Sequence, residues 1–195
     1  MIDLHLHTTA SDGALAPAAL VARAAAAGIT TLAVTDHDTT GGLDEARAAA
    51  SGRGMRLVNG IEITAVEGNR DVHVLGYFFD PANPSLRSFL EAQSADRIRR
   101  VKEMAEQLAV LGVLIDADPI VREGLATGRS VGRPHVAAAL LAAGHVRTRD
   151  EAFDRFLEHG RPAFIPRRGA SPDEVVRIIT NAGGVASLAH PGLAG

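Results

Sequence analysis

Apolar and polar residues alternate at the start of the chain. Ile2, Leu4 and Leu6 fall on one face of a predicted strand, and His5 and His7 fall on the other face. A period of two residues is typical of a β-strand that packs one face against apolar residues. Two imidazoles at this spacing on a rigid strand can bind one metal ion, although an isolated His-x-His pattern more often marks a solvated strand face.

Further apolar runs alternate with helical patterns along much of the chain. The run at 29–35 is almost continuously apolar, as in a parallel strand that is buried on both faces. Helices are predicted at 16–27, 43–51 and 172–182, and the last begins with a capping box formed by Ser171 and Glu174. The other predicted strands are 56–63, 72–77, a short stretch at 163–166, and 185–190. This order predicts an α/β fold.

Residues 80–162 interrupt the alternation, because they show helical patterns only. The longest pattern covers 86–111, and Arg97, Arg99 and Arg100 lie beside its apolar stripe. These arginines form either a small basic patch or an ordinary solvated face. A short helical region before Gly128 and helices at 136–143 and 151–159 complete this part of the chain.

The segment Gly132-Arg133-Pro134-His135 is a turn that opens the predicted helix 136–143. Backbone amides at the start of that helix, together with Arg133 and His135, could hold a phosphate group. A plain helix cap explains the glycine and the proline equally well.

Several predicted strands end in residues that can bind metal, at the position where α/β folds place their active sites. Asp12 lies in the turn after the first strand, and Asp36-His37-Asp38 follows the second. Glu62 lies in an apolar run, where a carboxylate costs several kcal/mol unless it is paired or neutralised. His73 lies among apolar residues, where a bond to a backbone carbonyl is the alternative explanation, and His190 ends the last predicted strand.

Composition limits the remaining possibilities. The chain has 195 residues, of which 46% are hydrophobic, so it can bury a core as one domain that carries an insertion. Its net charge of -3 gives no general argument for nucleic-acid or membrane binding. The absence of cysteine leaves His, Asp and Glu as the metal ligands. We expect a cytoplasmic protein, because no apolar stretch of about 18 residues and no basic, then apolar leader is found.

Five motifs in this order resemble the polymerase and histidinol phosphatase (PHP) superfamily. They are His5-Leu6-His7 with Asp12, Thr35-Asp36-His37-Asp38, Gly60-Ile61-Glu62-Ile63, His73, and Ala189-His190-Pro191. The arginines of the helical region and the Gly132–His135 turn make the chain most similar to the branch of nucleoside 3',5'-bisphosphate phosphatases and 5'-to-3' RNA exonucleases. The resemblance implies a distorted seven-stranded β/α barrel, formed by 1–79 and 163–195, with a helical insertion at 80–162.

The resemblance also implies a role for each candidate residue. His5 and His7 would bind a first metal, Asp12 and His37 a second, His73 and His190 a third, and Glu62 would bridge metals. Two or three divalent ions, such as manganese, zinc or iron, are expected. Asp36 would orient ligands or substrate, so that Asp36, His37 and Glu62 form the catalytic group. The expected substrate-binding residues are Arg97, Arg99, Arg100, Arg133 and His135.

The expected activity is hydrolysis of a phosphomonoester on a small nucleotide such as a nucleoside 3',5'-bisphosphate. The alternative is 5'-to-3' cleavage of RNA or short oligonucleotides, and no membrane or obligate protein partner is expected in either case. Family members carry a later Gly-Ser-Asp-x-His motif that this sequence does not contain, which leaves a non-catalytic metal-binding module as a further alternative. On this basis the barrel is expected to be incomplete at its C-terminus, and the 195-residue chain alone to be a weak or inactive hydrolase that self-associates.

Overall fold

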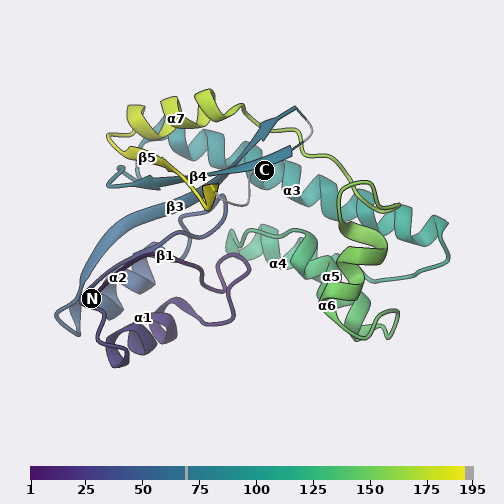
Figure 1. The fold of residues 1–195 in the computed structure, drawn as a ribbon, viewed down its shortest axis with the longest axis horizontal. Helices are drawn as coiled ribbons and strands as arrows, with labels where there is room; N and C mark the ends of the chain where they lie inside the picture. The colour runs from purple at the N-terminus through teal and green to yellow at the C-terminus, as the bar shows by residue number, and fades with distance from the viewer. Residues whose placement is uncertain (69, 192–195) are drawn as a thin grey trace. The chain divides into compact units, whose positions relative to one another are not determined.

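The computed structural model describes residues 1–68 and 70–191, which fall into two units (Figure 1). Unit 1 is built from Met1–Gln93 and Arg168–Gly195, and unit 2 is Ser94–Arg167. The bounds of unit 2 differ from those of the predicted insertion, 80–162. The first turns of helix α3 (Pro84–Val110) pack in unit 1, so unit 2 begins later than predicted. The role of that insertion stays a prediction.

Unit 1 contains a five-stranded mixed sheet, which confirms the predicted α/β class. Strands β1 and β2 and strands β2 and β3 pair in parallel, whereas β3 with β4 and β4 with β5 are antiparallel. Among the described residues the sheet is open, with β1 and β5 at its edges, so the seven-stranded barrel is not confirmed. The strands are β1 (Ile2–Leu6), β2 (Thr31–Val34), β3 (Arg56–Glu67), β4 (Arg70–Tyr77) and β5 (Val185–Leu188).

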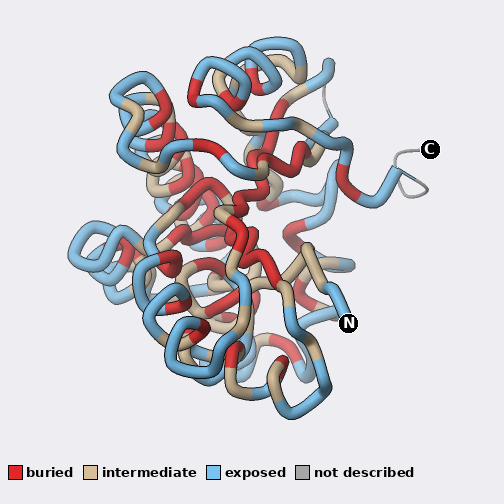
Figure 2. The backbone as a smooth tube through the Cα atoms, turned by 90° about the vertical axis from the view of Figure 1, so that its left-hand side faces the viewer, coloured by how far each residue is buried: buried red, intermediate tan, exposed pale blue. Residues whose placement is uncertain are grey.

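Helices cover the apolar face of this sheet and complete the core of unit 1. The strand residues Leu32, Ile61 and Ile63 pack in one buried cluster with Val21 and Ile179 of the helices. Figure 2 shows this burial along the strands and exposure along the outer sides of the helices. The helices are α1 (Pro17–Ala26), α2 (Leu43–Ser51), the first part of α3 and α7 (Pro172–Asn181).

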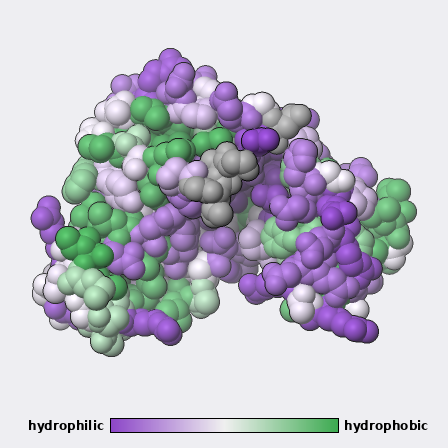
Figure 3. All heavy atoms as spheres, in the orientation of Figure 1, coloured by the Kyte–Doolittle hydropathy of each residue, from purple (hydrophilic) through white to green (hydrophobic). Residues whose placement is uncertain are grey.

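Unit 2 is helical and has a separate core. The second part of α3 packs its Val101, Met104 and Leu108 against Leu140 and Leu157. Hydrophilic side chains predominate on the face of unit 2 drawn in Figure 3. Its other helices are α4 (Asp118–Thr127), α5 (Arg133–Ala142), α6 (Arg149–Ala152) and the π-helix η1 (Phe153–Leu157). Among the described residues of either unit, no helix has the length and apolar character needed to cross a membrane.

The short strand predicted at 163–166 is wrong. The amide groups of Ala163 and Phe164 donate to Phe156 and Arg161 in a turn, and Pro166 has no amide hydrogen to donate to a neighbouring strand. The carbonyl oxygens of Ile165 and Pro166 accept hydrogen bonds from arginine side chains of α3 instead. Because the backbone groups are satisfied in this way, the stretch forms no sheet.

Candidate metal centre

Glu62 is fixed on both sides by main-chain hydrogen bonds. Its amide donates to the carbonyl of Asp36 at 3.2 Å, and its carbonyl accepts from the amide of Asp38 at 2.9 Å. The carboxylate of Asp38 accepts a further bond, from the amide of Thr64 at 2.8 Å. Since β3 places alternate residues on opposite faces, Ile61 enters the core and Glu62 faces the polar side with only 1% of its surface exposed.

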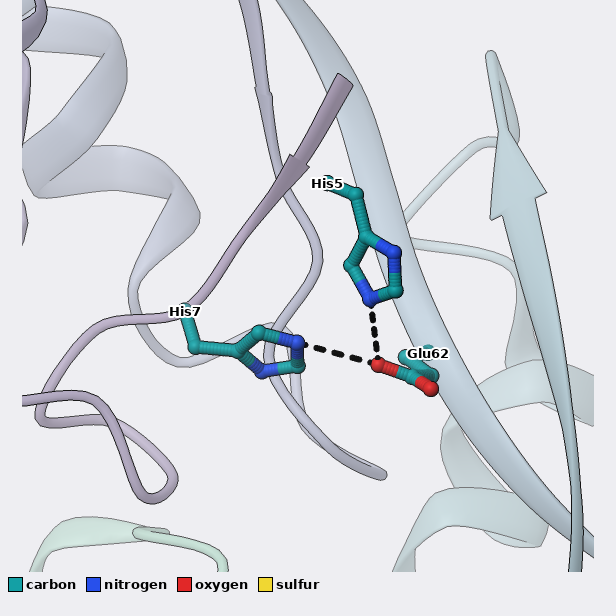
Figure 4. A group of neighbouring side chains, drawn as sticks. All are labelled: His5, His7 and Glu62. Carbon is teal, nitrogen blue, oxygen red and sulfur yellow. Dashed lines mark hydrogen bonds and ion pairs between the residues drawn. The ribbon is translucent and has the colours of Figure 1, made fainter. Parts of the chain in front are cut away.

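Five histidines surround the Glu62 carboxylate. Oε2 lies 2.8 Å from Nε2 of His5 and 3.0 Å from Nε2 of His7, and both rings point at it in Figure 4. The same oxygen lies 3.8 Å from Nδ1 of His37. On the other side of the carboxylate, Oε1 lies 2.7 Å from Nδ1 of His73 and 3.1 Å from Nε2 of His190. The predicted convergence of these residues is therefore present in the geometry.

Asp12 approaches the same group of histidines from the turn after β1. Its two carboxylate oxygens lie 3.7 Å from Nδ1 of His7 and 3.7 Å from Nε2 of His37. The turn closes through two hydrogen bonds to the carbonyl of Thr8, one of them from the amide of Gly13. A Cβ atom on Gly13 would lie 2.3 Å from the carbonyl oxygen of His7, so only glycine fits this close backbone approach.

Asp36 does not lie among these ligand atoms but holds the turn that carries Asp12. Its Oδ1 accepts from the amide of Thr8 at 2.7 Å and from the hydroxyl of Ser11 at 2.7 Å, and its Oδ2 accepts from the Thr8 hydroxyl at 2.6 Å. All three residues are buried. Sequence reasoning missed Thr8, Ser11 and the Asp38 anchor, because the residue types alone do not show which side chains these carboxylates meet.

The charges in this centre shift two pKa values in opposite directions. Burial alone would raise the pKa of Glu62, but the hydrogen bonds and positive charge of the surrounding histidines hold it far below its usual range. Burial alone would lower the pKa of His7, but the carboxylates of Glu62, Asp12 and Asp36 raise it. These contacts with the histidines therefore keep Glu62 ionised.

The donors fit divalent metal. Three overlapping groups have ligand atoms within 4.8 Å of one another: His5 with His7 and Glu62, His7 with Asp12 and His37, and His37 with Glu62 and His73. Imidazole nitrogens and carboxylate oxygens, without thiolates, suit zinc, iron or manganese. The buried Nδ1 of His7 has no hydrogen-bond partner among the described residues, as expected of a nitrogen placed to bind a metal.

The predicted substrate-binding arginines lie in unit 2, where the structure gives each of them contacts. Arg97 and Arg100 are buried and donate to the carbonyl oxygens of Val131 and Ile165. Arg99 forms ion pairs with Asp96 and Glu103 at 2.6 Å and 2.8 Å. These contacts account for Arg99 as a residue that stabilises α3, and its role in substrate binding stays a prediction.

The other two predicted substrate residues begin helix α5. Nδ1 of His135 accepts a hydrogen bond from the amide of Gly132 at 3.2 Å, so this histidine caps the helix. The guanidinium carbon of Arg133 lies 6.0 Å from the ring centre of Phe153 and 5.8 Å from that of Phe164. The helix starts three residues earlier than predicted, because Pro134 fits within a first helical turn.

Comparison with known proteins identifies close relatives. A protein from Chromobacterium violaceum, named 3',5'-nucleoside bisphosphate phosphatase, is 39% identical over 191 residues, which cover 98% of this chain and 67% of the relative. A protein from Haemophilus influenzae, named 5'-3' exoribonuclease, is 40% identical over 189 residues, which cover 97% of this chain and 68% of the relative. The chain thus spans about two thirds of the length of these relatives.

A solved structure leads to the same family. A Bifidobacterium adolescentis protein assigned as a metal-dependent phosphoesterase matches with a TM-score of 0.90 at 39% identity, over 98% of this chain and 67% of that one. Residues 3–149, which include every candidate ligand except His190, match the PHP domain. Together with the curated relatives, these matches confirm the resemblance found in the sequence: the chain belongs to the PHP domain family.

Proposed function

We propose that this chain is a metal-dependent phosphoesterase that hydrolyses a phosphomonoester of a small nucleotide, such as a nucleoside 3',5'-bisphosphate. The observation that carries the proposal is the Glu62 carboxylate, which is buried and within 3.8 Å of five histidine side chains. A buried carboxylate surrounded by imidazoles is a donor set suited to a multinuclear hydrolase centre. The name of the Chromobacterium violaceum relative supports the substrate class.

Each residue of the centre has a proposed task. His5, His7, Asp12, His37, Glu62, His73 and His190 would hold two or three divalent ions such as manganese, zinc or iron. Such ions, when bound, lower the pKa of coordinated water and stabilise negative charge on the phosphoryl oxygens. Glu62 contributes a charge that stays ionised at neutral pH, because its pKa lies below the usual range. Asp36 positions Asp12 through the buried Thr8 and Ser11 contacts.

Arginines of unit 2 are proposed to recognise the phosphate that does not react. A guanidinium group keeps its charge at any physiological pH and can form two parallel hydrogen bonds to one phosphate. Arg97, Arg100 and Arg133 are the proposed residues, with His135 holding the start of α5 through its bond to Gly132. Binding of the second phosphate would make the protein select a bisphosphorylated nucleotide over a simple phosphomonoester.

Exonuclease activity on RNA is the second candidate. The Haemophilus influenzae relative, named 5'-3' exoribonuclease, is as similar to this chain as the phosphatase is. The same centre suits both reactions, because a phosphomonoester and a terminal phosphodiester need the same activated water and the same stabilisation of phosphoryl charge. The two substrates differ in the phosphoryl group, because a phosphodiester carries a second ester oxygen in place of one charged oxygen.

A comparison of substrates tests the proposal. However slow its turnover, the purified chain, supplied with manganese, is expected to release phosphate from adenosine 3',5'-bisphosphate faster than it releases mononucleotides from a 5'-phosphorylated oligoribonucleotide. Changing His5 and His7 together to alanine should remove bound metal and this activity. Retention of full metal content by the double variant would refute the centre, and tight metal binding without turnover of either substrate would favour a non-catalytic module.

A further inference from the structure

Unit 2 carries an aromatic and cationic cluster that the metal centre does not explain. The cluster consists of Arg133, Phe153, His159 and Phe164. The guanidinium of Arg133 lies within 6.0 Å of the two phenylalanine ring centres, and the rings of His159 and Phe164 lie 5.1 Å apart in an edge-to-face arrangement. His159 is exposed, and the other three residues are partly exposed.

The core of unit 2 does not need the Phe164 ring. Ala163 is fully buried in that core and Ile165 packs against it, whereas Phe164, between them, is not a member of the cluster. Phe164 is partly exposed and lies outside that core. The ring contacts of Phe164 are with Arg133 and His159 instead.

Backbone hydrogen bonds order the main chain that carries this ring. The amide of Glu158 donates to Phe153, Arg161 to Glu158 and Phe164 to Arg161, and this succession carries the chain from the π-helix to Phe164. The π-helix, which begins at Phe153, is itself a rare element that is frequent at functional sites. An aromatic side chain on an ordered backbone loses less conformational entropy when it stacks with a flat ligand.

The charge of Arg133 indicates the kind of flat ligand. Unit 2 has 12 Lys and Arg residues and 10 Asp and Glu residues, a net charge of +2, whereas the whole chain has a net charge of -3. This small net charge does not decide the ligand, but a guanidinium over aromatic rings suits one that is both planar and anionic. A nucleotide combines these two properties, because its base stacks on aromatic and guanidinium planes and its phosphate is negative.

We propose that Phe164, His159 and Arg133 form a nucleotide-binding site on unit 2, in which the nucleobase stacks on the aromatic rings and Arg133 contacts the phosphate. The inference rests on the proposed function, because that function identifies the ligand as a nucleotide. The base belongs either to a mononucleotide or to the 5' end of an RNA strand. Stacking accepts any base, so the site would select nucleotides over sugar phosphates without selecting a sequence.

Binding without turnover tests the site. In the presence of a chelator, isothermal titration should show that the chain binds adenosine 5'-monophosphate more tightly than ribose 5-phosphate. Phe164→Leu keeps the apolar volume but removes the π face, and it should weaken binding of the nucleotide about tenfold while leaving ribose 5-phosphate unchanged. Phe78→Leu, at an exposed phenylalanine of unit 1, is the matched control and should change neither ligand.

A second variant protects the test against a folding defect. His159→Ala changes an exposed side chain and should weaken nucleotide binding in the same direction as Phe164→Leu. Titration with 5'-phosphorylated diadenylate shows whether a second nucleotide adds affinity, which separates an RNA end from a mononucleotide. Equal binding of nucleotide and ribose 5-phosphate by the unmodified chain, or equal losses for both ligands in the variants, would overturn the proposal. Because the titrations measure binding and not hydrolysis, they test this site even if the chain shows no metal-dependent hydrolysis.

Discussion

Replacing Glu62 by glutamine should disrupt two metal sites and spare a third. The carboxylate belongs to the group with His5 and His7 and to the group with His37 and His73, but not to the group formed by His7, Asp12 and His37. Glutamine has nearly the same volume, so the substitution removes the charge without opening a cavity. Metal bound per chain should therefore fall, with at most the Asp12 group still occupied.

The size of the effect follows from the contacts. Each affected ion loses an anionic ligand, and the loss of a charged interaction of this kind costs about 1.5–3 kcal/mol. This energy corresponds to roughly 10-fold to 150-fold weaker binding. One effect acts in the opposite direction and favours metal binding. The negative charge of Glu62 raises the pKa of His7, so its removal lowers that pKa and reduces the competition of protons with metal for His7. An alkaline assay pH reduces that competition in both proteins, so that the loss of the ligand dominates.

The assay is equilibrium dialysis against manganese or zinc at pH 8, followed by metal analysis and calorimetric titration. Glu67→Gln is the matched control, because Glu67 lies on the same strand, is exposed and is in none of the three ligand groups. The control should bind metal as the unmodified chain does. If Glu62→Gln bound as many ions with unchanged affinity, Glu62 would not be a ligand, and the geometric argument for the centre would be refuted.

Three other predictions follow from the same residues. In the presence of a chelator, the lowered pKa of Glu62 contributes its full stabilisation of the fold at pH values above 4.5, the ordinary pKa of a glutamate. The raised pKa of His7 contributes its full stabilisation at pH values below 6.5, the ordinary pKa of a histidine. The Tm of the metal-free chain should therefore be highest between these pH values and fall as the pH rises through the folded pKa of His7, and a Tm that kept rising to pH 9 would contradict this. Gly13→Ala should weaken metal binding by displacing Asp12, since the new Cβ would lie 2.3 Å from a backbone oxygen, and dialysis beside a thermal melt would separate this from unfolding. Arg100→Ala should reduce turnover of a bisphosphorylated nucleotide about 10-fold or more, with little effect on an aryl phosphate, because only the former has a second phosphate; equal losses would count against the role.

Local sequence patterns predicted the helices of unit 1 well, because their apolar faces and end signals are encoded in neighbouring residues. Helix α2 has the predicted bounds, 43–51, and α7 begins with the predicted capping box of Ser171 and Glu174. The ligand group could also be predicted, since polar residues at the ends of several strands of one sheet have few other places to meet.

The antiparallel pairing of β3 with β4 was not predicted. Strand β3 extends to Glu67, four residues beyond the predicted end, and β4 begins two residues before its predicted start. The hydrophobic pattern did not predict this extension, because it includes the polar residues Thr64 and Glu67 in β3 and the charged pair Arg70-Asp71 in β4. The Gly68-Asn69 dipeptide between the two runs is a hairpin signal that could have revealed it. Contacts such as Asp36 with Thr8 and Ser11 are different, because they depend on tertiary packing that no local pattern encodes.

The unpredicted hairpin explains how one carboxylate reaches so many histidines. Residues up to Asn59 of β3 pair in parallel with β2, and residues from Gly60 onward pair in antiparallel with β4. Glu62 lies just beyond this change, where His37 forms an isolated parallel bridge on one side and Leu75 pairs on the other.

Residues that follow the carboxyl ends of neighbouring parallel strands lie at the same edge of a sheet. His7 follows β1 and His37 follows β2, so both lie on one side of Glu62. An antiparallel strand runs back past the same point and delivers residues from its interior. His73 pairs with Thr64, two positions along β3 from Glu62, and is a diagonal neighbour on the same face. The mixed pairing of β3 therefore adds a ligand from a strand that runs in the opposite direction, and the carboxylate is approached from both sides.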